Sequence, residues 1–128
     1  MALLLDTTVL IDVLRGRPAF ERVRLAHRRG EPLFCCAINV DEVYRGIRPS
    51  EERSAGRVFN GLRLAPLGRS EGERAGRWRR EFGERGVTLG QADCLVAAAA
   101  VGVGARLATA NVRHFPMPDV DVEPWPGT

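Results

Sequence analysis

Three acidic residues and one amide stand where together they could hold a divalent metal ion. Asp6 follows an apolar run, Glu42 lies one turn into an expected helix, Asp93 is the one charge in an apolar stretch, and Asn111 follows a strand pattern. Their oxygens suit Mg²⁺ or Mn²⁺, whereas zinc would need the histidines and thiols that lie elsewhere. Three carboxylates close together repel one another unless a cation binds them. Such a site is typical of phosphoryl chemistry, in which the metal orients water and neutralises phosphate oxygens.

Each carboxylate also has a purely structural interpretation. Asp6 can cap the helix that follows it, Glu42 can complete a capping box with Asn39, and Asp93 can lie at a helix N-terminus, where the dipole favours an anion. Capping does not explain why Asp93 is the only charge in its apolar helix, because burying an unpartnered carboxylate costs on the order of several kcal/mol. The four residues together therefore favour a shared site.

The elements that must position these residues follow from periodicity and breakers. We expect strands over residues 3–5, 33–36, 64–67, 105–109 and 120–122. We expect helices over residues 9–14, 19–29, 50–62 and 91–101, with two more opened by capping boxes at Asn39 and Ser70. Strands that alternate with helices predict an α/β fold with parallel pairing and helical crossovers. Ligands of such sheets bind beyond the carboxyl ends of the strands, so the four residues would meet in one pocket.

Length and composition limit what else the chain can be. Its 128 residues fit a single domain, 1–128, and all 19 basic side chains are arginine. The absence of lysine excludes a phosphate-binding loop, a protein kinase and Schiff-base chemistry. It also argues against haloacid-dehalogenase-type phosphatases and response-regulator receivers, which need a lysine. The formal net charge of +3 is compatible with a nucleic-acid partner but does not establish one.

The cysteines and the apolar segments indicate an ordinary intracellular domain. Cys35, Cys36 and Cys94 are odd in number and form no disulfide framework, so we expect buried free thiols. The longest apolar stretch is far shorter than the roughly 20 residues that cross a bilayer, and the N-terminus has no signal-peptide pattern. We therefore expect a cytoplasmic protein without membrane association.

Four segments also carry a family resemblance. Residues 4–12, 42–46, 92–99 and 107–115 resemble, in order and spacing, the signature blocks of PIN-domain ribonucleases, specifically the VapC-type toxins of toxin–antitoxin systems. The resemblance implies an α/β/α sandwich around a mostly parallel sheet, with an acidic pocket that binds Mg²⁺ or Mn²⁺ and cuts RNA. It also implies an antitoxin protein that blocks the pocket, and we expect a homodimer.

The resemblance assigns roles residue by residue. Asp6, Glu42 and Asp93 match the three principal acids, which hold the metal, and Thr7 or Thr8 matches a hydroxyl position. Asn111 completes the predicted catalytic set but departs from the pattern, because many members have a fourth acid there. An amide supplies one neutral oxygen, so occupancy of a second metal position is left open.

Several alternatives remain at this point. The main one is a catalytically degenerate PIN-like module that binds protein or RNA, and a smaller one has Asp119 or Asp121 supplying the fourth acid. We interpret the arginines of residues 74–85 as a solvated helix face paired with interleaved glutamates, and Trp78 as a core residue. His27 is expected to be structural on an apolar face, and Asp12 to cap or pair within the domain.

Overall fold

The computed structural model describes residues 1–125 of the chain. Over that part, five strands, six α-helices and two short 3₁₀ helices follow one another as β1 (Leu3–Leu5), α1 (Thr7–Leu14), α2 (Pro18–Arg28), β2 (Leu33–Cys35), α3 (Ala37–Gly46), η1 (Pro49–Glu51), α4 (Glu52–Asn60), β3 (Arg63–Leu64), α5 (Arg69–Glu84), α6 (Gln91–Gly102), β4 (Arg106–Thr109), η2 (Val112–His114) and β5 (Val122–Pro124). The predicted strands and helices are all present, with shifted ends, while Pro126 and the two residues after it lie outside the described residues.

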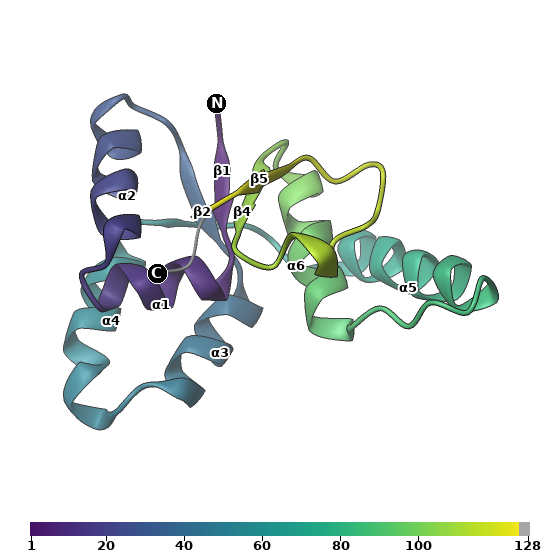
Figure 1. Ribbon diagram of the computed structural model, residues 1–128, viewed down its shortest axis with the longest axis horizontal. Helices are drawn as coiled ribbons and strands as arrows, with labels where there is room; N and C mark the ends of the chain where they lie inside the picture. Colours follow the sequence, from purple (N-terminus) through teal and green to yellow (C-terminus); the bar gives the residue numbers. More distant parts are fainter. Residues whose placement is uncertain (126–128) are drawn as a thin grey trace.

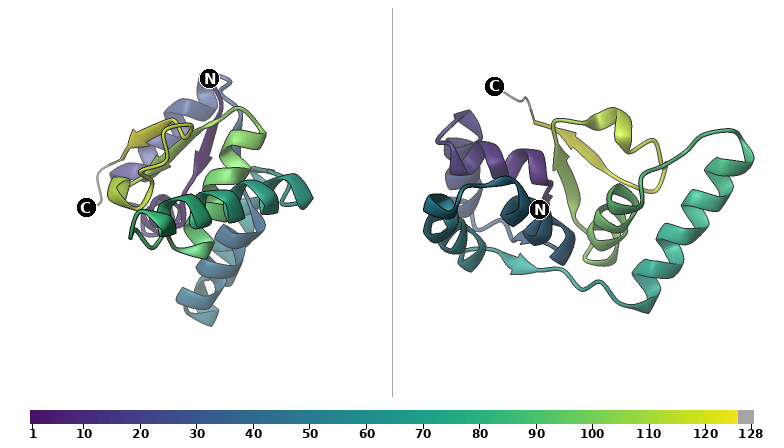
Figure 2. Two further views of the ribbon diagram at one scale, coloured as in Figure 1. Left: turned by 90° about the vertical axis from the view of Figure 1, so that its right-hand side faces the viewer. Right: turned by 90° about the horizontal axis from the view of Figure 1, so that it is seen from below.

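The strands form one parallel sheet in the order β3-β2-β1-β4-β5. The chain builds outward from β1 to β3, and then α5 and α6 carry it back to β4 on the other side of β1. Figure 1 shows α1, α2 and α4 on one face of the sheet and α5 and α6 on the other, with α3 below its carboxyl edge. Figure 2 shows the same layers from two further sides. The predicted α/β/α sandwich around a parallel sheet is confirmed.

Side chains of the central strands are buried on both faces, as expected for a sheet covered by helices on each side. Leu4 and Leu107 pack with Trp78 in the core under α5 and α6, and Leu5 packs with Leu10 in the core under α1 and α2. Complete burial of each such leucine contributes roughly 1.5–3 kcal/mol. The predictions of a core tryptophan and of three buried free thiols are confirmed.

Two helices begin earlier than their sequence signals predicted, for the same reason. α3 begins at Ala37, and Asn39, which was expected to precede it, lies inside the helix and accepts the backbone N–H of Cys36 at 2.9 Å. Similarly, Glu71 accepts the backbone N–H of Gly68 at 2.7 Å, so α5 begins before Ser70. In both cases a side chain of the first turn reaches back to the residue before the helix, so the true cap lies upstream of the expected cap, by three residues for Asn39 and by two for Ser70.

Within residues 1–125, none of the helices combines the length and the apolar character needed to cross a membrane.

Candidate active site

Asp6 lies where the strand order reverses, between the carboxyl ends of β1 and β4. Its carboxylate is held at both oxygens, since Oδ1 accepts the backbone N–H of Thr7 at 2.9 Å and Oδ2 accepts the hydroxyl of Thr109 at 2.7 Å. Only 6% of the residue is exposed. Burial raises the pKa of Asp6, the bonds from Thr109 and Thr7 oppose the rise, and the negative charges of Asp93 and Glu42 add to it. Asp6 is thus both the expected helix cap and a buried anion.

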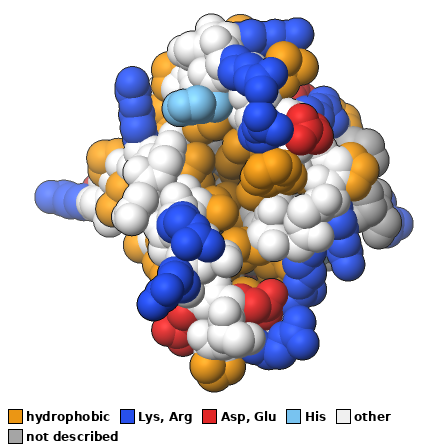
Figure 3. Space-filling model, turned by 90° about the vertical axis from the view of Figure 1, so that its left-hand side faces the viewer, with side chains coloured by type: hydrophobic (Ala, Val, Ile, Leu, Met, Phe, Trp, Pro, Cys, Tyr) orange, Lys and Arg blue, Asp and Glu red, His pale blue; other side chains and the backbone are white. Residues whose placement is uncertain are grey.

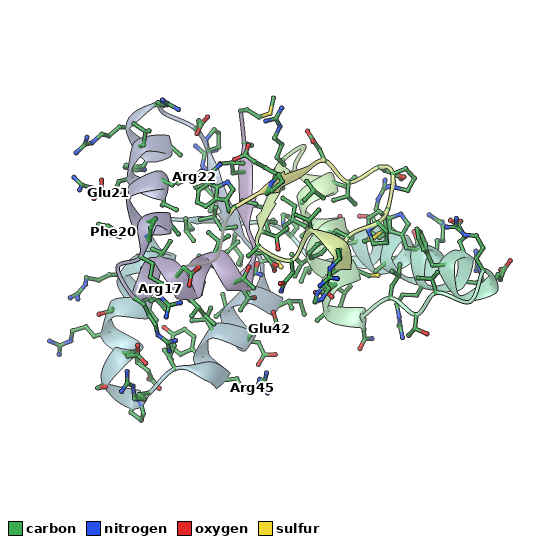
Figure 4. The ribbon with its side chains drawn as sticks, viewed as in Figure 1. Arg17, Phe20, Glu21, Arg22, Glu42 and Arg45 are labelled. Carbon is green, nitrogen blue, oxygen red and sulfur yellow. The ribbon has the colours of Figure 1, made fainter. Side chains whose placement is uncertain are left out.

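Glu42 reaches the same edge of the sheet from α3. Its Oε1 accepts the hydroxyl of Thr7 at 2.6 Å, which joins the start of α1 to α3. The capping box that the sequence suggested for Glu42 is therefore wrong, because α3 begins before Asn39. Figure 4 shows Glu42 on α3 near the junction of the helices with the sheet, and Arg45 one turn further along.

Asp93 occupies the first turn of α6, as predicted. Its Oδ2 lies 3.4 Å from Nδ1 of His114, which belongs to η2. Burial raises the pKa of Asp93, His114 opposes the rise, and the negative charge of Glu42 adds to it. Asp93 is therefore close enough to Glu42 and Asp6 for the three carboxylates to influence one another electrostatically.

Asn111 follows β4, with an exposed side chain and a backbone N–H that donates to the hydroxyl of Thr109 at 2.9 Å. The alternative acids lie elsewhere, because Asp121 precedes β5 and so stands at the amino edge of the sheet. Arg106 lies 3.1 Å from Asp121, and Arg74 lies 3.3 Å from Asp119. These pairings give both aspartates a structural role outside the pocket.

Two residues of this network were not identified as site residues from the sequence. Thr109 donates to Asp6, and Asn39 donates from Nδ2 to the hydroxyl of Thr7 at 3.2 Å. The signal for Thr109 was its place at the end of β4, beside the end of β1. Asn39 had no such signal, because its sequence position indicated only a helix cap.

The donor set has the chemistry of a site for a hard divalent cation. It consists of carboxylates at one sheet edge, with threonine hydroxyls beside them. Like charges on these carboxylates raise the pKa of Asp6 and of Asp93, and a bound cation would relieve that repulsion. As they stand, Asp6 and Glu42 accept hydroxyl protons, and no group of three His, Cys, Asp or Glu side chains in residues 1–125 is arranged to hold an ion.

A separate apolar groove lies between α1, α2 and α4, with a volume of about 550 Å³. Its floor includes Leu5, Val13 and Val58. Its rim includes Phe20, which is 41% exposed, and the basic side chains Arg24, His27, Arg28 and Arg57. Figure 3 shows this face, with hydrophobic side chains gathered in a hollow and arginines around it. His27, expected to be structural on an apolar face, is exposed on this rim.

Other predictions concerned residues outside the pocket. Asp12 forms the expected internal pair, 2.8 Å from Arg17. On α5, Glu73 pairs with Arg69 at 3.0 Å and Arg74 pairs with Asp119 at 3.3 Å, so among residues 1–125 the arginines of residues 74–85 do not form the expected pairs with the interleaved glutamates.

Comparison with known proteins decides the family. The model of the PIN domain family matches residues 3–120. The chain belongs to the PIN domain family. Ribonuclease VapC10 of Mycobacterium tuberculosis is 34% identical over 115 residues, which cover 90% of this chain and 86% of that protein. The chain is accordingly a PIN domain homologous to the VapC ribonucleases.

Solved structures of toxin–antitoxin complexes share this PIN fold. VapBC2 from Rickettsia felis, bound to a DNA fragment from its promoter, superposes with a TM-score of 0.82 at 20% identity and covers 98% of this chain and 99% of that one. A toxin–antitoxin complex from Klebsiella pneumoniae gives 0.75 at 24% identity, with 97% and 98% covered. At these identities the likeness shows the fold.

Proposed function

We propose that this PIN domain, residues 1–128, is a VapC-type endoribonuclease toxin whose active site consists of Asp6, Glu42, Asp93 and Asn111. The observation that carries the proposal is the hydrogen-bond network at the point where the strand order reverses, in which Thr7 donates to both Asp6 and Glu42 and Thr109 donates to Asp6. That place and that donor set are suited to metal-assisted hydrolysis of a phosphodiester. Its homology to VapC ribonucleases identifies RNA as the substrate.

Asp6, Glu42 and Asp93 would hold Mg²⁺ or Mn²⁺, which when bound supplies Lewis acidity at the scissile phosphate and lowers the pKa of the attacking water. The chain's own part is to place the carboxylates and to hold their charge in a partly buried pocket. Thr7 and Thr109 donate to Glu42 and Asp6 and so fix the direction of each carboxylate. Asn111 contributes one neutral oxygen at the rim, which favours one firmly held ion over two.

The partner on the apolar groove is the cognate antitoxin. An apolar groove of about 550 Å³ with an arginine rim fits an amphipathic segment that has apolar side chains on one face and acidic residues at its borders. The solved structures with this fold include a toxin–antitoxin complex, which supports an antitoxin as occupant. The protein would act in the cytoplasm, where its RNA substrate and antitoxin are available, and it would form a homodimer.

The competing function is a degenerate PIN module that binds a partner without cleaving RNA. The Asn111 departure is the observation that favours it. Cleavage of a pool of total RNA by the purified, antitoxin-free chain separates the two functions. We expect cleavage with Mn²⁺ or Mg²⁺, loss of cleavage in EDTA, and recovery when Mn²⁺ is added back. Intact RNA under all metal conditions would support the degenerate module.

A further inference from the structure

The side-chain amide of Asn39 connects two helices inside the core. Asn39 is fully buried and lies one turn before Glu42 on α3. Because its Oδ1 accepts the backbone N–H of Cys36 at 2.9 Å, Nδ2 is the end that meets Oγ1 of Thr7, at 3.2 Å. Capping α3 requires only Oδ1. The bond from Nδ2 to Thr7 therefore serves something other than the cap.

That bond decides where the hydroxyl proton of Thr7 goes. A threonine hydroxyl has one proton, and an amide N–H cannot accept it. Since Nδ2 of Asn39 donates to Oγ1, the proton of Thr7 is directed to Oε1 of Glu42, 2.6 Å away. A hydrogen bond to a carboxylate at this distance is charge-assisted and holds the acceptor firmly.

The second carboxylate is held by the same kind of arrangement. The hydroxyl of Thr109 receives the backbone N–H of Asn111 at 2.9 Å and donates to Oδ2 of Asp6 at 2.7 Å. In each case an N–H group occupies a threonine oxygen, so that the hydroxyl proton points at a carboxylate. For Asp6 the N–H comes from the backbone, whereas for Glu42 it comes from a side chain that mutation can remove.

We propose that Asn39 is a positioning residue of the cleavage site, which orients the hydroxyl of Thr7 and through it the carboxylate of Glu42. This rests on the proposed function, because Glu42 must belong to the catalytic pocket. Without the amide, the Thr7 hydroxyl is free to turn. The partly buried Glu42 side chain can then adopt several rotamers, and it must lose that freedom before its carboxylate takes the position needed for cleavage.

A spectroscopic test needs neither metal nor RNA. In the metal-free protein, the hydroxyl proton of Thr7 should exchange slowly enough to be resolved by proton NMR and should show a cross-peak to the Glu42 side chain. The signal should disappear in Asn39→Ala, while backbone amide peaks of α5 and α6 stay in place as the folding control. A hydroxyl signal unchanged in Asn39→Ala would overturn the proposal.

A kinetic cycle tests the route through Thr7. Asn39→Ala and Thr7→Val should each lower kcat for RNA cleavage about tenfold with little change in KM, and Thr7→Ser, which restores the hydroxyl, should recover most of the activity that Thr7→Val loses. The double variant should lose no more than either single variant, since both remove the same interaction. Losses that multiply to about a hundredfold would show that Asn39 acts independently of Thr7, which contradicts the proposal.

A second variant keeps the test decisive if Asn39→Ala does not fold. Asn39→Asp keeps an acceptor for the N–H of Cys36, but its other oxygen cannot donate to Thr7 while ionised. If Asn39 only caps α3, Asn39→Asp should keep the kcat of the parent. We expect instead that Asn39→Asp lowers kcat about tenfold, and that it causes no further loss of kcat in a protein that already carries Thr7→Val. If the parent protein gives a resolved NMR signal for the Thr7 hydroxyl proton but cleaves no RNA, the proposed function is refuted while the hydrogen-bond network stands.

Discussion

The hydroxyl of Thr109 donates a 2.7 Å hydrogen bond to Oδ2 of Asp6, joining residues 103 positions apart in the chain. The bond crosses from the end of β4 to the end of β1, at the place where the strand order reverses. Both residues are buried, and the carboxylate is held in a fixed direction by the hydrogen bonds from Thr109 and Thr7. The candidate site is therefore built into the centre of the sheet.

Removing this donor should weaken both the fold and the site. Thr109→Val keeps the shape of the side chain but leaves Oδ2 of Asp6 and the backbone N–H of Asn111 without their partner. We expect a loss of roughly 1–3 kcal/mol in the free energy of unfolding, measured in urea at pH 7. Thr109→Ser is the matched control and should stay close to the parent. Equal stability of the two variants would show that the bond contributes nothing.

The stability of the metal-free protein should depend on Asp93 in a pH-dependent way. Because the pKa of Asp93 is raised by burial, the native state binds its proton more tightly than the unfolded chain does. The contribution of Asp93 is therefore favourable at low pH and is lost as the pH rises through the raised pKa. Asp93→Asn should melt higher than the metal-free parent at pH 7, with the difference closing toward about pH 4.

The neighbouring imidazole provides a control for that experiment. His114 lies 3.4 Å from Asp93 and offsets part of the unfavourable charge when protonated. The gain from Asp93→Asn should therefore be larger in a His114→Gln background. If Asp93→Asn does not change the melting temperature at pH 7, either in the parent or in the His114→Gln background, then the charge of Asp93 does not destabilise the metal-free protein.

Position 111 should set the number of ions bound. In the parent we expect one Mn²⁺ to bind firmly and a second only weakly, because Asn111 lacks charge. Asn111→Asp adds an anion of nearly equal size, so calorimetric titration with Mn²⁺ should show tighter binding of the second ion, and the metal-free variant should be less stable than the parent. Unchanged stoichiometry and affinity in the variant would place position 111 outside the metal-binding group.

Charge reversal on the groove rim should separate antitoxin binding from cleavage. Arg57 lines the groove from α4, and Arg57→Glu should weaken binding of the proposed antitoxin partner at least tenfold without changing RNA cleavage. Arg53→Glu, on the same helix but outside the groove lining, is the matched control. Equal losses in the two variants would indicate a general charge effect and not a groove contact.

The sequence predicted the fold and the place of the acids more fully than it predicted how they are held. The apolar run before Asp6 and the alternation of strands with helices were enough to indicate a parallel sheet with its acids at one edge, because those signals are local. The partners of the acids could not be predicted in the same way. Thr109 contacts Asp6 only through strand pairing, and Asn39 contacts Thr7 only through the packing of α3 on α1.

The groove shows what helical periodicity leaves undecided. Phe20, Val23 and His27 share one face of α2, and that periodicity indicated an apolar face. In the structure this face borders an open groove, so Phe20 and His27 are exposed. Periodicity indicates an apolar face, but it does not distinguish a face buried within the chain from one that lines an open groove.

The most direct test of the central claim is RNA cleavage by Asp6→Asn in saturating Mn²⁺. The amide keeps the volume of the side chain but removes the anion that would hold the ion. Asp41→Asn, at an exposed position on α3 beside Glu42, is the matched control. We expect Asp6→Asn to fold and to lose cleavage by at least a hundredfold, while Asp41→Asn cleaves as the parent does. Cleavage by Asp6→Asn at the parent's rate would contradict the assignment of the active site.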